Sequence, residues 1–399
     1  MAKLFLHIGM PKAGSTSIQE AFDAHRAALR AHGINYPDLG PSHSKVYLAL
    51  FSAKKLKLRT RVTKHLGADE ALEDYDLGEL ERVLAAELTF GNAPVTVSSG
   101  EMLFRFSARQ CRDLKAFLDP HFSEIRIVAY LREPIGLANS RAQQNVKGGR
   151  ETLSAMADLK AIRSGRSALV PHYREALETW MGVFGRDALE IREFDRKAFL
   201  GGDLVTDFAA LVGVPEDLRP AMAGGWTKTA RNAETVLILD RYLERSRKGD
   251  RPAFGPLRDM IEEVPGSRFA LPRDVLEAVW RASEAEIAWL ESVTGRRFFE
   301  GVDPAKAAVE AAWPAETRAA LEAIVGAPVP DIAALPAAER PKAIDRLCDA
   351  LVAKTKGRKI SRKYARGRLA PLLDRARDAL GFLRHKLRRM FKGRRRAGG

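Results

Sequence analysis

The chain has 399 residues, of which 46% are hydrophobic, enough for one large or two ordinary domains with a real core. Its two cysteines argue against a disulfide framework and fit a reducing compartment. The chain has 66 basic and 51 acidic residues. Residues 354–399 hold eighteen of the basic and two of the acidic residues, which leaves 48 basic and 49 acidic residues in 1–353. Because the formal charge of +15 falls to −1 without this tail, the body of the protein is not expected to bind nucleic acid.

The first predicted elements are a strand, a loop and a helix that together favour phosphate binding. Residues 4–8 are apolar, as in a buried strand, and residues 17–31 carry a helical pattern. The loop between them contains glycines, one lysine and a cluster of hydroxyls. Backbone N–H groups and the positive end of the helix dipole converge at such a loop, so we expect an anion to bind there.

The position of Lys12 indicates the phosphate chemistry. In a nucleoside-triphosphatase loop, G-x-x-x-x-G-K-[ST], the lysine follows the second glycine. Gly9 and Gly14 have that spacing, but Ser15 occupies the lysine position and Lys12 comes earlier. The segment 11–16 resembles the 5′-phosphosulfate loop, roughly P-K-[ST/A]-G-T-[TS], of sulfotransferases that use 3′-phosphoadenosine-5′-phosphosulfate (PAPS). Ser15 replaces the more usual threonine and keeps the hydroxyl. The alternative is a tight turn with a solvated Lys12. By this resemblance the nucleotide's 5′ end contacts Pro11, Lys12, Ala13, Gly14, Ser15, Thr16 and Ser17.

A second motif follows a predicted strand in the middle of the chain. Residues 125–131 form a short apolar run that is typical of a buried parallel strand. Arg132, Glu133 and Pro134 come next, and Ser140 lies eight residues beyond the arginine. This order resembles the 3′-phosphate site of sulfotransferases, where an arginine fork offers paired N–H donors. Glu133 departs from the usual aspartate or asparagine. The alternative is an arginine paired with a nearby acid.

Weaker matches to bacterial members of the same family occur elsewhere. Tyr36 and the later His43 match one segment, and a strand over residues 95–98 leads to Glu101. The region of Arg231 is similar to a segment that often closes over the nucleotide. The resemblance therefore covers about the first two-thirds of the chain.

The resemblance implies an in-line sulfuryl transfer, in which positioning and charge stabilisation do most of the catalysis. Lys12 would stabilise the departing nucleotide phosphate, and the backbone N–H groups of residues 13–16 would hold the 5′-phosphate. Arg132 and Ser140 would hold the 3′-phosphate. The scheme needs no metal, and no cysteine or histidine spacing indicates one.

The acceptor hydroxyl needs a general base, and two residues are candidates. Glu101 comes at the carboxyl end of a predicted strand, where open α/β sheets place their sites. His43 lies in a Gly/Pro/Ser loop and titrates near neutrality without perturbation. The sequence does not decide between them.

Strands that alternate with helices predict an α/β fold with a central parallel sheet flanked by helices, similar to P-loop NTPases, and a helical C-terminal extension. We expect a catalytic domain over residues 1–300, an Ala/Pro-rich helical extension or linker over 301–353, and a basic amphipathic helical tail over 354–399. The predicted strands cover residues 4–8, 95–98, 125–131 and 189–193.

The tail carries leucines at three- and four-residue steps, with arginines on most of the remaining positions. Such a helix is typical of an element that binds an anionic membrane surface. The alternatives are packing of the leucines on the protein's own body and binding of an anionic glycan. No signal peptide or membrane-spanning run is recognisable, so we expect a cytoplasmic protein that the tail could bring to the inner face of the membrane.

The predicted function is transfer of a sulfuryl group from PAPS to a hydroxyl of a carbohydrate, a lipid-linked sugar or another acceptor. Two alternatives stay open. One is a nucleotide kinase or other phosphate-loop NTPase, and the other is a non-catalytic scaffold with a nucleotide-binding fold.

Overall fold

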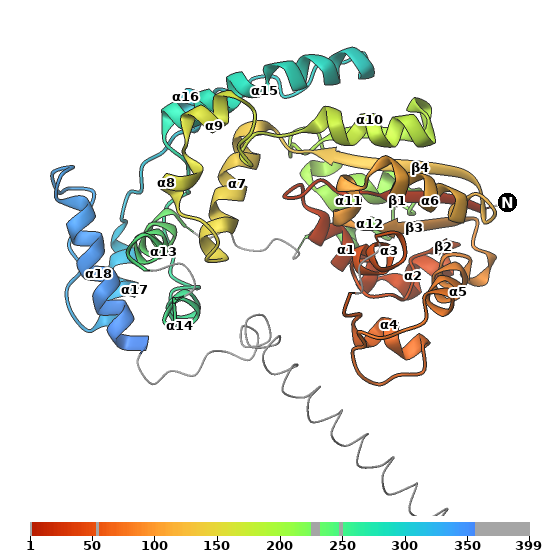
Figure 1. Ribbon diagram of the computed structural model, residues 1–399, viewed down its shortest axis with the longest axis horizontal. Coiled ribbons are helices and arrows are strands. Elements are labelled where there is room, and N and C mark those ends of the chain that lie inside the picture. Colours follow the sequence, from red (N-terminus) through yellow and green to blue (C-terminus); the bar gives the residue numbers. More distant parts are fainter. Residues whose placement is uncertain (1, 53–55, 225–231, 247–249, 356–399) are drawn as a thin grey trace, which may run out of the picture. The chain divides into compact units, whose positions relative to one another are not determined.

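A computed structural model describes the chain except for residues 1, 53–55, 225–231, 247–249 and 356–399 (Figure 1). Two compact units alternate along the sequence. The first comprises Met1–Ala142, Ser154–Ala230 and Ala270–Val309, and the second comprises Gln143–Leu153, Arg231–Phe269 and Glu310–Gly399. The expected basic helix lies almost wholly outside the described residues, and the expected boundaries at residues 300 and 353 stay predictions.

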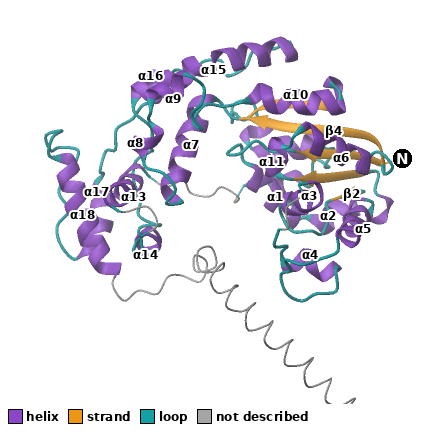
Figure 2. Ribbon diagram, viewed as in Figure 1, coloured by secondary structure: helices purple, strands orange, loops and turns teal. Residues whose placement is uncertain are grey.

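The first unit is built on a five-stranded parallel sheet in the order β2-β3-β1-β4-β5. Helices flank the sheet, which confirms the predicted α/β class (Figure 2). Each predicted strand is present. The short β2 was not predicted, because no apolar run marks it in the sequence. The strands are β1 (Ala2–His7), β2 (Ile34–Asn35), β3 (Val95–Ser99), β4 (Phe122–Leu131) and β5 (Leu189–Glu193).

The central strands are apolar because helices cover them. Leu4 and Leu6 of β1 and Ile127 and Val128 of β4 are fully buried. Such near-continuous apolar runs are typical of parallel strands with both faces covered. In this sheet β1 lies between β3 and β4, and all three strands run parallel. Their carboxyl ends are therefore neighbours, and the segments that follow them share one edge of the sheet.

The helices of the first unit surround the sheet or extend from it. They are α1 (Ser15–Ala24), α2 (Arg26–Ala31), α3 (Ser44–Phe51), α4 (Thr60–His65), α5 (Leu77–Leu88), α6 (Ala108–Leu118), the start of α7 (Pro134–Lys147), most of α8 (Leu153–Met156), α9 (Leu159–Arg163), α10 (Tyr173–Phe184), α11 (Leu204–Leu211), α12 (Arg219–Met222), α15 (Arg273–Thr294) and α16 (Pro304–Ala307). A short 3₁₀ helix, η2 (Glu101–Arg105), follows β3.

One predicted helix is divided. The pattern over residues 17–31 predicts a single helix, whereas the structure has α1 and α2 with a break at His25. His25 has φ −101° and ψ 16°, outside helical geometry, and its Nδ1 lies 2.9 Å from the carbonyl oxygen of Ala21. The backbone N–H of His25 also donates to the Ala21 carbonyl, at 3.1 Å, so α1 closes its last hydrogen bond at this residue.

The second unit is helical and contains α13 (Ala233–Arg245), α14 (Phe254–Met260), α17 (Ala315–Val325), α18 (Arg340–Thr355) and the end of α7. The buried carboxylate of Glu234 joins two of its segments, because it accepts hydrogen bonds from the Ser267 backbone at 2.9 Å and the Trp313 backbone at 3.1 Å. A helical C-terminal region was predicted and is confirmed. Within the described ranges, no helix combines the length and apolarity that a bilayer crossing requires.

Candidate functional site

The loop between β1 and α1 has an unusual backbone. Gly9, Lys12 and Gly14 have φ of 51°, 73° and 75°. A left-handed conformation is costly for lysine, and such strain concentrates at functional sites. Gly14 precedes α1, where the first N–H groups of the helix are unpaired by the helix itself. A Cβ added to Gly14 would collide with Leu204 and lie 2.7 Å from Phe194, so this position requires glycine on both counts.

The loop meets the second predicted motif. Arg132 directly follows β4, and its Nη1 donates a hydrogen bond of 3.0 Å to the carbonyl oxygen of Lys12. The Arg132 guanidinium lies 5.6 Å from the ring centre of Phe194, and the Tyr173 hydroxyl donates to the Arg132 carbonyl at 2.6 Å. Two cationic segments predicted from separate parts of the sequence therefore lie together at one edge of the sheet.

Glu133 starts the helix that carries Ser140. Its Oε1 accepts a hydrogen bond of 2.5 Å from the backbone N–H of Gly136, which satisfies one of the free donors at the start of α7. A Cβ at Gly136 would lie 2.9 Å from Arg132 Nε, so glycine also leaves space for the guanidinium. Ser140 is half-buried and lies six residues into α7, about 9 Å along its axis at ~1.5 Å per residue.

Glu101 lies beside the same loop. It is half-buried at the start of η2, which hydrogen bonds hold against β1: Gly100 N–H donates to His7 at 2.9 Å and Phe104 N–H donates to Ile8 at 3.1 Å. A Cβ at Gly9 would lie 3.1 Å from Glu101 Cα. The absence of a side chain at Gly9 thus lets Glu101 approach the loop closely.

His43 is placed differently from Glu101. Its ring is fully buried, 4.6 Å from the ring of Tyr36, and Nδ1 lies 2.8 Å from Ser98 Oγ. The backbone N–H of Ser99 also points to Nδ1, at 3.3 Å. Because a backbone N–H can only donate, this network assigns Nδ1 as the acceptor and puts the proton on Nε2. Burial lowers the pKa of His43 to about 4, so the ring is neutral near pH 7.

His7, which the sequence does not single out, lies under the loop. Its Nδ1 is 2.8 Å from Ser99 Oγ, which also accepts from Gln19 Nε2 at 3.2 Å. Burial lowers the pKa of His7 to about 3. His7 Nε2 and Ser15 Oγ are buried and have no hydrogen-bond partner among the described residues. Both border Gly9, since its added Cβ would lie 2.6 Å from Ser15 Oγ and 3.4 Å from His7 Cε1. Buried polar atoms normally have partners, so these two fit a site that receives a polar ligand.

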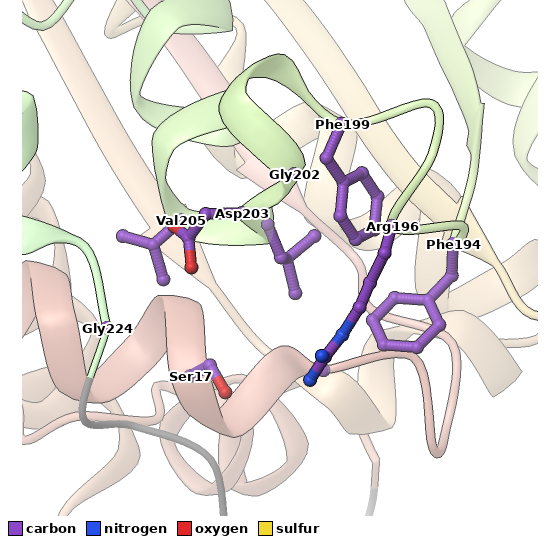
Figure 3. Close-up of a pocket in the computed structure, with 10 residues that line it drawn as sticks. Ser17, Phe194, Arg196, Phe199, Gly202, Asp203, Val205 and Gly224 are labelled. Atoms are coloured by element: carbon purple, nitrogen blue, oxygen red, sulfur yellow. The ribbon is translucent and has the colours of Figure 1, made fainter.

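A cavity of about 210 Å³ opens beside the loop (Figure 3). Typical small-molecule pockets measure ~300–1,000 Å³, so this one has room for only part of a nucleotide. Its walls combine aromatic and polar side chains from the start of α1, the segment after β5 and the start of α11. The lining residues are Gly14, Ser17, Phe194, Arg196, Phe199, Gly202, Asp203, Leu204, Val205 and Gly224.

The remaining predicted residues have ordinary positions or lie outside the described part. Ala13 is buried, and its N–H donates to Met10 at 3.1 Å, while Pro11 and Thr16 are half-buried. Arg231 lies outside the described residues. The described part of the chain contains no group of three or more His, Cys, Asp or Glu that could hold a metal ion.

Comparisons with known proteins add little to this geometry. No family model matches the chain, and no curated protein matches its sequence. Among solved structures, the crystal structure of a sulfotransferase from Alicyclobacillus acidocaldarius matches with a TM-score of 0.38 and 16% identity, over 74% of this chain and 96% of that one. A similarity this low carries no argument about activity, which depends on the chain's own residues.

Proposed function

We propose that this protein is a sulfotransferase that moves a sulfuryl group from PAPS to an acceptor hydroxyl. The observation that supports this most is the hydrogen bond of 3.0 Å from Arg132 to the carbonyl of Lys12. PAPS carries phosphates at both ends of its ribose, so its binding requires two cationic segments within the length of one nucleotide. A loop that binds only a 5′-phosphate would need only the first of these segments, the one that contains Lys12.

Each segment has a role in nucleotide binding. The N–H groups of residues 14–16 and the unpartnered Ser15 hydroxyl would hold the 5′-phosphate, as anions bind at a helix N-terminus, whereas the Ala13 N–H, which the sequence also predicted to bind it, already donates to Met10. Arg132 and Ser140 would hold the 3′-phosphate. Part of the nucleoside would enter the cavity beside Phe194, which Arg196 also lines with an exposed side chain.

The transfer forms a bond between the acceptor oxygen and sulfur, and it breaks the bond between sulfur and the bridging phosphate oxygen. Negative charge grows on that phosphate, where the Lys12 ammonium would stabilise it. The acceptor proton goes to a base. We assign this role to Glu101, because it adjoins the loop and is half-buried. The fully buried His43 contacts Ser98 and Ser99 through Nδ1 and has a low pKa, which suits a structural role.

The test of the donor is a thermal-shift comparison of 3′-phosphoadenosine 5′-phosphate (PAP), PAPS, ADP and ATP. We expect stabilisation by the 3′-phosphorylated pair only, because binding to the folded state raises its stability. Arg132→Ala should remove the preference for PAP over ADP. Magnesium-dependent stabilisation by ATP with no response to PAP would instead favour the NTPase alternative.

The base is tested separately. Glu101→Gln should lower kcat by about 10²- to 10⁴-fold and leave PAP binding unchanged, since only the proton acceptor is removed. Near-normal turnover of this variant would contradict the assignment.

A further inference from the structure

Helix α11, whose first residues line the cavity, also carries a buried carboxylate that the proposed transfer does not use. Asp207 is 4% exposed and accepts three hydrogen bonds. Tyr130 Oη donates to Oδ2 at 2.6 Å, while Arg192 Nη2 and the Leu200 backbone N–H donate to Oδ1 at 3.0 and 3.1 Å. These donors belong to β4, β5 and the short 3₁₀ helix η4 (Leu200–Gly202). One carboxylate on α11 therefore contacts three other segments of the first unit.

The carboxylate holds a large part of the cavity wall. We define the cavity segment as residues 194–203, which lead from β5 to α11. Arg192 and Asp207 lie just outside its two ends and form an ion pair of 3.0 Å, so the pair closes the segment into a loop. Seven of the ten residues that line the cavity lie between these two partners (Figure 3). The position of the wall therefore depends on this pair.

The cavity segment consists of turns and η4. Its start is fixed to the sheet, because the Phe194 N–H donates to the Leu131 carbonyl at 2.7 Å. Further along, the Phe199 N–H donates to Asp195 at 3.2 Å, and the Gly202 N–H donates to Phe199 at 2.9 Å. Such bonds within the segment fix its local shape but not its position relative to the sheet. The bond from Leu200 to the carboxylate on α11 supplies that second constraint.

The cavity segment and the start of α11 contact both predicted phosphate sites. A Cβ at Gly14 would collide with Leu204 and lie 2.7 Å from Phe194, so these two side chains lie directly against the loop between β1 and α1. Phe194 also lies under the Arg132 guanidinium, with 5.6 Å between the guanidinium and the ring centre. A displacement of α11 or of the cavity segment would therefore disturb the surroundings of both sites.

The contacts of Asp207 fix positions more than they add stability. A buried ion pair contributes little net stability, because the loss of hydration offsets much of the attraction between its charges. Hydrogen bonds to a carboxylate are directional, however, and three of them are satisfied together in only a narrow range of positions. Burial, and next the hydrogen bond to Asp207, raise the pKa of Tyr130, so the phenol keeps the proton that it donates.

We propose that Asp207 is a positioning residue for nucleotide binding, a role that rests on the proposed function. Its carboxylate holds the cavity segment and α11 in place against the loop between β1 and α1 and against Arg132. It is buried and would act through these neighbours rather than on the nucleotide itself. Since its three donors come from residues other than Lys12 and Glu101, loss of its charge should weaken nucleotide binding and leave the chemical step nearly unchanged.

The test uses Asp207→Asn, which removes the charge and keeps the shape of the side chain. We expect the Kd of PAP, measured by isothermal titration calorimetry, to rise about tenfold, because small displacements of a binding surface are costly. In transfer of labelled sulfate from PAPS, the KM for PAPS should rise by a similar factor while kcat stays within about twofold. Hydrogen exchange at the Leu200 amide should become at least about tenfold faster, since its acceptor is weaker.

A second variant reaches the same carboxylate from β4. Tyr130→Phe removes one of the three donors and keeps the ion pair with Arg192, so it should raise the Kd of PAP by about threefold. The matched control is Gly213→Ala, just after α11, where an added Cβ meets nothing within 4 Å. This variant strains the backbone without touching the cavity, and it should leave the Kd of PAP unchanged.

Unchanged PAP affinity in both Asp207→Asn and Tyr130→Phe would overturn the inference. An equal loss of affinity in Gly213→Ala would also overturn it, because the effect would then follow from lost stability alone. A fall in kcat without a change in the KM for PAPS would contradict a role in binding. A wild-type protein that gives no thermal shift with PAP or PAPS would instead refute the proposed donor, and faster exchange at Leu200 in Asp207→Asn would still support the anchoring of the cavity segment.

Discussion

Lys12 has a backbone conformation that glycine would adopt at lower cost. Its φ of 73° is disfavoured for an L-residue by about 1–2 kcal/mol, yet a lysine is kept there. We infer that the role of the Lys12 ammonium in transfer outweighs this backbone strain. A substitution that relieves the strain and removes the ammonium should therefore raise stability and lower activity.

Lys12→Gly should raise the free energy of unfolding by about 1 kcal/mol and lower the transfer rate at least ~100-fold. Urea unfolding and transfer of labelled sulfate from PAPS measure the two effects. Lys12→Ala is the control, because it removes the ammonium and keeps a Cβ: it should lose transfer without the gain in stability. Equal stability of the two variants would contradict this account of Lys12.

His7 and His43 make the fold sensitive to acid. Their pKa values fall from 6.5 to about 3 and about 4 because burial disfavours the charged ring. The unfolded chain therefore binds more protons in this range, and stability decreases as the pH falls from 6.5. The decrease ends near pH 4 for His43 and near pH 3 for His7.

Each histidine should contribute a slope of about 1.4 kcal/mol per pH unit to the unfolding free energy between those limits. Urea unfolding from pH 6.5 to pH 4.5 measures the slope, and His43→Gln should reduce it by one histidine's share. Carboxylates titrate in wild type and variant alike, so the comparison isolates His43. A slope that the substitution leaves unchanged would mean that His43 is not buried as a neutral ring.

At the scale of elements, the junction between the loop and α1 depends on the packing of Gly14 as well as on its φ. Gly14 and Gly213 both have positive φ, 75° and 84°, but an added Cβ at Gly213 meets nothing within 4 Å. Gly213→Ala should therefore cost about 1 kcal/mol of stability, from the backbone alone. Gly14→Ala should cost several kcal/mol, because Leu204 and Phe194 must move. If urea unfolding showed equal losses of stability for the two variants, Leu204 of α11 would be able to move at little cost, which would contradict the close packing at Gly14.

The same junction explains how far the sequence could predict the site. Arg132 directly follows β4, and Lys12 lies in the loop that follows β1, so their place at the carboxyl edge follows from the parallel sheet. The hydrogen bond between them depends on the strand order, which no local pattern contains. Phe194 and Arg196 likewise reach the loop through the packing of β5 and α11.

His7 and His43 show the limit for single residues. Each is one histidine in an apolar or loop context, and the sequence offers no sign that both bond to the serines at the end of β3. That arrangement needs the register of β1 and β3, in which His7 pairs with Ser99. The one sign in the sequence that His7 is unusual is its position, since it is a polar residue at the end of an otherwise apolar strand.

At the scale of the whole molecule, the charge is divided between a nearly neutral body and a strongly basic tail. Residues 354–399 hold eighteen of the 66 basic residues and two of the 51 acidic ones, so the tail alone accounts for the excess positive charge. A leucine pattern runs through the same segment. Both features are typical of a segment that binds anionic membranes.

Membrane binding by the tail and catalysis by the body should be separable. Deletion of residues 354–399 should abolish sedimentation with phosphatidylserine vesicles, because apolar burial and charge attraction are lost together. It should leave sulfuryl transfer to a soluble saccharide within about twofold of the full chain, since every predicted site residue precedes residue 354. The control replaces the leucines of the tail by serine and keeps its arginines: weaker but measurable vesicle binding would indicate that charge acts with apolar burial. Vesicle binding that survives the deletion would assign the membrane contact to the body, and loss of transfer would mean that the tail takes part in the acceptor site.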